Sequence, residues 1–113
     1  MTDTAGFLVA LTTLGSVDDA RRLVRSLVDD RLVACGTILE GATSVYRWEG
    51  NVTEDREVVV IFKTRLDRWT ELAEAVNARH PYDVPELLAL PVGSGLEAYL
   101  RWVETETTSL EPR

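Results

Sequence analysis

Apolar residues follow two kinds of spacing along the chain, and together they predict a mixed α+β fold. Phe7 to Leu11 and Val58 to Phe62 are apolar at every position, which is typical of strands buried on both faces. Val33 to Tyr46 reads as extended but contains Gly36 and Gly41, which predicts a bent or bulged strand. We therefore expect two central strands and one irregular strand.

Three further segments have the spacing of amphipathic helices. Ser16 is placed to cap the first, whose apolar face runs from Ala20 to Val28. Asp67 is placed to cap the second, and Pro81 ends it by disfavouring helical geometry at the preceding residue. Ser94 to Glu97 forms a capping box for a third helix. The apolar stripe of that helix consists of Leu96, Tyr99, Leu100 and Val103.

The order of these elements predicts the fold. Glu49 to Asn51 is a turn signal that joins two strands in a hairpin, and Leu87 to Leu90 predicts a short fourth strand. The order matches the split βαβ arrangement. We predict one domain over residues 1–113, a ferredoxin-like βαββαβ sandwich with an added C-terminal helix and an ordered core of about residues 7–107. The tail from Thr107 to Arg113 lacks periodicity and is expected to fray.

One edge of this sheet is expected to carry aromatic side chains. The second strand would lie at the edge and present Tyr46 and Trp48. Natural proteins usually cover an exposed aromatic edge, because its unpaired backbone groups can join another strand. Self-association of the chain would cover it.

Charge and cysteine content exclude several classes of partner. Acidic residues outnumber basic residues by 19 to 12, and the formal net charge of -7 repels phosphate backbones and anionic membrane surfaces. We expect neither a nucleic-acid nor a membrane partner. The single cysteine, Cys35, permits no intrachain disulfide, and the N-terminal segment lacks the pattern of a signal peptide. A cytoplasmic location is expected.

His80 is the only histidine, and it falls at a predicted helix end. One interpretation is a half-buried histidine whose ring is hydrogen-bonded to a backbone carbonyl. The other is a metal ligand or proton carrier. A metal site normally needs three or four protein ligands, so His80 would require Cys35, Glu86 or a residue from another chain.

Cys35 and Lys63 also allow two interpretations each. Cys35 has apolar neighbours that favour a buried, inert thiol, and a nucleophilic role would need His80 to activate it. Lys63 and Glu57 bracket an apolar strand, where charged groups are usually hydrated or paired. Motifs for a phosphate-binding loop, a Cys-x-x-Cys site or a Gly-x-Ser-x-Gly nucleophile do not occur.

Five segments closely resemble the CutA divalent-cation tolerance proteins. They are Arg31 to Cys35, Gly41 to Gly50, Phe62 to Arg65, His80 to Glu86 and Tyr99 to Trp102, in order between about Phe7 and Thr107. The resemblance implies a ferredoxin-like subunit in a tight homotrimer, formed through the long hairpin and similar in shape to the PII signalling proteins. It also implies a non-enzymatic role in tolerance of copper and other divalent cations.

The resemblance further implies which residues form a site. Cys35, Lys63, His80, Tyr82 and Glu86 match the family pattern, and in a trimer they would gather as ligand-binding residues in a cleft between subunits. The copper site proposed in some members corresponds to Thr12, Arg79 and His80. A hydroxyl is a weak copper ligand and a guanidinium offers no lone pair. His80 is then the single candidate metal ligand of this set, and a divalent metal such as copper is the candidate cofactor.

Three functional hypotheses follow. The first is a non-enzymatic homotrimer of the CutA type with an inter-subunit metal or ligand site. The second is a PII-like small-molecule-binding regulator, in which Lys63 and Arg65 hold an anionic ligand. The third is an enzyme that depends on Cys35.

Overall fold

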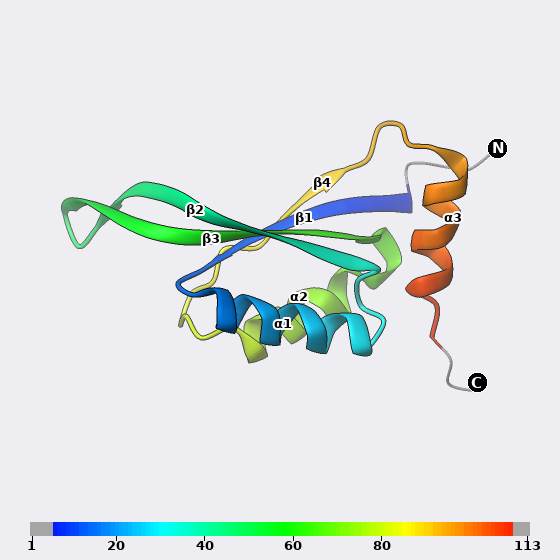
Figure 1. Ribbon diagram of the computed structural model, residues 1–113, viewed down its shortest axis with the longest axis horizontal. Helices are drawn as coiled ribbons and strands as arrows, with labels where there is room; N and C mark the ends of the chain where they lie inside the picture. The colour runs from blue at the N-terminus through cyan, green and yellow to red at the C-terminus, as the bar shows by residue number, and fades with distance from the viewer. Residues whose placement is uncertain (1–5, 110–113) are drawn as a thin grey trace.

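The computed structural model describes residues 6–109, in which one sheet is combined with three α-helices (Figure 1). The elements are β1 (Phe7–Leu14), α1 (Val17–Asp29), β2 (Cys35–Trp48), β3 (Asn51–Arg65), the 3-10 turn η2 (Leu66–Arg68), α2 (Trp69–Arg79), β4 (Leu88–Pro91) and α3 (Glu97–Glu106). All strand pairs are antiparallel, in the order β2-β3-β1-β4. This is the predicted ferredoxin-like topology with its added helix, and β1 and β3 are central as expected.

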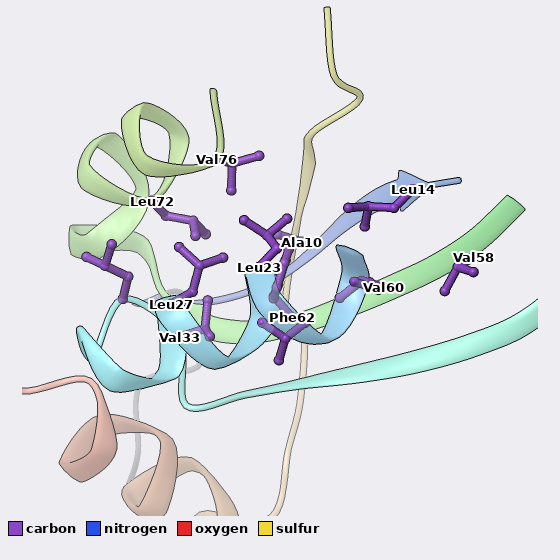
Figure 2. Packing of buried hydrophobic residues seen from close by; sticks show 13 residues of the cluster. Ala10, Leu14, Leu23, Leu27, Val33, Val58, Val60, Phe62, Leu72 and Val76 are labelled. Atoms are coloured by element: carbon purple, nitrogen blue, oxygen red, sulfur yellow. The ribbon is translucent and has the colours of Figure 1, made fainter. Parts of the chain in front are cut away.

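Helices α1 and α2 lie on the same side of the sheet, and the main core lies between the two layers (Figure 1). Alternate side chains of β1 and β3 point into it because successive strand residues face opposite sides. Figure 2 shows these side chains meeting the apolar faces of α1 and α2. The fully buried members include Ala10, Leu14, Leu27, Val33, Val60, Phe62, Leu72 and Val76.

The β2–β3 hairpin extends well beyond the two helices (Figure 1). Its strands have 14 and 15 residues; β2 has about the predicted length, whereas β3 begins well before the predicted apolar run at Val58. The pairing shifts between Leu39 and Ala42, where Gly41 has a φ of 83° that favours glycine, so the predicted bulge is confirmed. At the tip, Glu49 and Gly50 both have positive φ, as tight hairpin turns require.

The predicted helix caps are only partly right. Ser16 caps α1, since its Oγ accepts a hydrogen bond from the Asp19 backbone N–H at 3.1 Å. Asp67 lies inside η2, and α2 begins after Arg68 without a side-chain cap. The capping box at Ser94 is also wrong, because α3 starts at Glu97 and its N-cap, Leu96, makes no side-chain hydrogen bond.

Helix α3 packs across one end of the sheet. Leu100 and Val103 are buried against Phe7 and Ala34, whereas Leu96 and Tyr99 of the predicted stripe are exposed. An extended N-cap puts Leu96 outside the helical face that contacts the sheet.

The chain stays packed at the end of α3, contrary to the predicted fraying from Thr107. Thr107 is fully buried and its hydroxyl donates to the Val103 carbonyl at 2.7 Å. Arg65 donates from Nε to the Thr107 hydroxyl at 2.9 Å and from Nη2 to its carbonyl at 3.1 Å. The prediction for the last four residues lies outside the described part of the chain.

The other face of the sheet is apolar, and among residues 6–109 only α3 covers it, at one end. Residues directly opposite each other in antiparallel strands share a face, so Leu88, Leu11 and Ile61 form one cross-strand row. Leu90 and Val9 continue it in the next row. Leu88 and Leu90 are 58% and 51% exposed, whereas the helix-facing Ala10 and Val60 are fully buried. Within residues 6–109, no helix is long and apolar enough to cross a membrane.

Candidate functional site

His80 follows directly after α2, and its ring is held from both sides. Pro81 favours an extended preceding residue, and His80 has φ -73° and ψ 140°. Its Nε2 lies 2.7 Å from the Thr13 carbonyl oxygen, and its Nδ1 accepts the Tyr82 backbone N–H at 3.1 Å. Because a carbonyl only accepts, Nε2 carries the proton and the ring is the neutral tautomer. The side chain is buried, and both nitrogens have partners.

The loop after His80 is fixed to β1 by a second hydrogen bond. Thr12, which is fully buried, donates from its hydroxyl to the Glu86 carbonyl oxygen at 2.7 Å. Arg79 points elsewhere, since its guanidinium pairs with Asp30 at 2.6 Å and donates to the Ser26 hydroxyl at 3.2 Å.

These contacts do not fit a copper ion at the positions implied by the resemblance. The one free lone pair of the His80 ring, on Nδ1, already accepts a backbone N–H. The Thr12 hydroxyl is bonded to a carbonyl, and the Arg79 guanidinium has no lone pair to offer. Within residues 6–109, no group of three or more His, Cys, Asp or Glu side chains is arranged to hold a metal ion. The described part of one subunit therefore does not supply the donor set for this centre.

Tyr82 connects the same loop to the hairpin. Its ring lies 4.7 Å from the His80 ring, and its hydroxyl donates to Glu57 Oε2 at 3.3 Å. Burial, followed by the charge of Glu57, raises the pKa of Tyr82. Tyr46 donates its hydroxyl to the Asp55 carboxylate, and that hydrogen bond is the main reason why the pKa of Tyr46 is raised.

A cavity of about 560 Å³ opens between this loop and the hairpin. We call it the acidic cavity. Tyr46, Trp48 and Tyr82 are among the residues that line it. Four acidic residues also line it, namely Asp55, Glu57, Asp83 and Glu86. No lysine or arginine among the described residues contributes to its lining.

Cys35 and Lys63 lie together on the open side of the sheet. They are directly paired between β2 and β3. Lys63 donates from Nζ to the Thr37 hydroxyl at 2.6 Å, and the Cys35 sulfur lies 3.9 Å from the Tyr99 hydroxyl. Cys35 is partly exposed. Burial and its contact with Cys35 raise the pKa of Tyr99.

Within one subunit, this pair does not meet His80. The imidazole contacts Thr13, whose β3 partner is Val59, and Lys63 lies four residues further along the same strand. Strand geometry makes that separation roughly 13 Å. The structure thus brings together His80, Tyr82 and Glu86 from the predicted site, and holds Cys35 and Lys63 apart from them.

Three acidic residues of the cavity were not predicted as site residues, namely Asp55, Glu57 and Asp83. Alternation along β3 was an available signal for Asp55, because Asp55 and Glu57 are two residues apart and share a face. Asp83 lies within the His80 to Glu86 segment, but its place in the cavity depends on how the loop after α2 folds back on the hairpin.

The fold and the site define a class: a small ferredoxin-like α+β subunit with an overlong hairpin, an open apolar sheet face and a cavity where the hairpin meets the loop after α2. The family model described as "CutA1 divalent ion tolerance protein" matches residues 8–106. The chain therefore belongs to the CutA family.

Individual relatives agree over nearly the whole chain. A divalent-cation tolerance protein CutA of Thermus thermophilus is 44% identical over 99 residues, which covers 88% of this chain and 96% of the relative. A chloroplastic CutA of Arabidopsis thaliana is 42% identical over 100 residues, and the match covers 88% of this chain but 55% of the plant protein.

Solved structures of the family share the fold. The Thermus thermophilus protein superimposes with a TM-score of 0.87 at 43% identity, covering 90% of this chain and 99% of that one. CutA1 from Oryza sativa gives a TM-score of 0.89 at 39% identity, with 94% and 98% covered.

Proposed function

We propose that this protein acts in the response to divalent metal ions, including copper, as a non-enzymatic homotrimer. The observation that carries the proposal is the family match, which spans residues 8–106 and joins the chain to relatives named for divalent-cation tolerance. The family is named for tolerance and not for a catalysed reaction.

The open sheet face supports the homotrimer. Leu39, Leu88 and Leu90 are exposed, and Leu11 and Ile61 between them are only partly covered. A contiguous apolar surface of this kind usually marks an interface, because burying it removes apolar area from water at about 25 cal/mol per Å². Three copies that turn these faces toward a common axis would form the core of an assembly similar to the PII proteins.

The exposed hairpin is a second observation that supports the homotrimer. Strand β2 is an edge of the sheet, and Val45 and Trp48 on it are 59% and 61% exposed. A long exposed edge is a site for strand pairing or packing with another chain. The hairpin reaches past the helices of its own subunit and would reach a neighbouring copy (Figure 1).

Two alternatives receive no support. For an anionic ligand held by Lys63 and Arg65 the structure offers no further observation: Lys63 donates to the Thr37 hydroxyl, and Arg65 pairs with Asp67 at 3.3 Å and binds Thr107. A Cys35-dependent enzyme would need an activating imidazole, and His80 lies elsewhere in the subunit.

Direct copper binding at His80 is not part of the proposal, because both ring nitrogens are occupied within the subunit. The ligand site we propose contains His80, Tyr82 and Glu86, with Cys35 and Lys63 able to join it only from a neighbouring copy. His80 serves there as a positioning residue that holds the loop of Tyr82.

The test is growth under metal stress. A bacterial strain that lacks its own CutA gene is grown with added copper or cobalt, with and without this chain. We expect the chain to restore growth, and a variant that cannot assemble, Leu88→Glu, to restore less. Equal growth with and without the chain at every metal concentration would refute the proposed role.

We also propose a cytoplasmic location, because the single cysteine makes no disulfide and needs no oxidising compartment. The names of relatives give different cellular locations. The Arabidopsis protein is called chloroplastic, and a related Archaeoglobus fulgidus protein of known structure is called periplasmic. Fractionation of the source cells with an antibody against the chain decides the matter, and recovery outside the cytoplasmic fraction would contradict it.

A further inference from the structure

We draw no further inference here: the strongest candidate, the groove of about 680 Å³ between the C-terminal end of α1 and α2, carries none, because its three arginines, Arg31, Arg68 and Arg79, already pair with Glu106, Glu71 and Asp30, and nothing in the described part of the chain indicates what would bind there.

Discussion

At the scale of single residues, His80 and Thr12 hold the loop after α2 against β1. The His80 ring bonds to Thr13 on one side and Tyr82 on the other, and the Thr12 hydroxyl bonds to Glu86. These three contacts position Tyr82 and Glu86, which line the acidic cavity. The shape of the cavity therefore depends on buried polar groups that do not themselves line it.

Thr12→Val tests the contribution of one of these contacts. Valine keeps the shape of threonine but removes the hydroxyl that donates to the Glu86 backbone carbonyl oxygen. We therefore expect a loss of about 1–2 kcal/mol in the free energy of unfolding. Urea titration at a fixed protein concentration measures it. Thr43→Val, an exposed change on β2, is the control and should have little effect. A loss no greater than the control's would contradict the assigned hydrogen bond.

The raised pKa of Tyr82 predicts that the free energy of unfolding depends on pH. Its folded pKa is raised above the unfolded value of about 10. The stability it contributes is therefore fully present below pH 10 and is lost as the pH rises through the folded value. Glu57→Gln removes a neighbouring charge and should lower the pKa of Tyr82, which is read from the ultraviolet absorbance of tyrosinate. An unchanged titration in Glu57→Gln would contradict the contribution of Glu57 to the raised pKa of Tyr82.

The sequence allowed two interpretations of His80, and a backbone carbonyl as its partner was one of them. It did not identify Thr13, because the contact joins residues 67 positions apart in the chain. Nor did it indicate that Nδ1 would accept the Tyr82 N–H, since that depends on the loop conformation after Pro81. Local patterns predict where a polar side chain lies more readily than which distant group it meets.

At the scale of elements, the sequence predicted the start of only one of the three α-helices correctly. Ser16 was predicted correctly because its cap and the first turn of α1 are contiguous. Asp67 and Ser94 were not, because each helix starts later than its pattern implies. Asp67 pairs with Arg65, and the N-cap of α3 is Leu96, two residues after Ser94.

Ser16→Ala and Ser94→Ala form a matched pair that tests this difference. Loss of a serine N-cap costs about 1 kcal/mol, so Ser16→Ala should lower the free energy of unfolding by that amount. Ser94→Ala removes a hydroxyl that does not cap α3 and should change it little. Urea titration under identical conditions compares them. Similar losses in both variants would mean that Ser94 caps α3 after all.

The strands were predicted more fully than the helix starts. Continuous apolar runs marked β1 and β3 as central, and Gly41 marked the bulge. The outer part of β3, from Asn51 to Arg56, was not apparent, because it is polar and largely exposed, so no burial pattern distinguishes it from a loop. Pairing between the two strands, and not burial, maintains it as a sheet.

At the scale of the whole molecule, the apolar sheet face should control assembly. Leu88→Glu introduces a charge on this face at a side chain that is 58% exposed in the subunit. The fold of one subunit should tolerate it, whereas an interface that buries it should not. We expect the mass in solution, measured by light scattering, to fall to that of one chain. Leu96→Glu, at an 81% exposed position that precedes α3 and lies outside the strands, should keep the mass of the unmodified protein.

The central claim is that the chain forms a homotrimer through its open sheet face. The mass of the unmodified full chain tests this claim most directly. Native mass spectrometry of the freshly purified protein measures it, together with any retained ligand. The account predicts a species of about three times the 12.6 kDa of one chain. A single chain of 12.6 kDa at micromolar concentration, with the sheet face open to water, would contradict it.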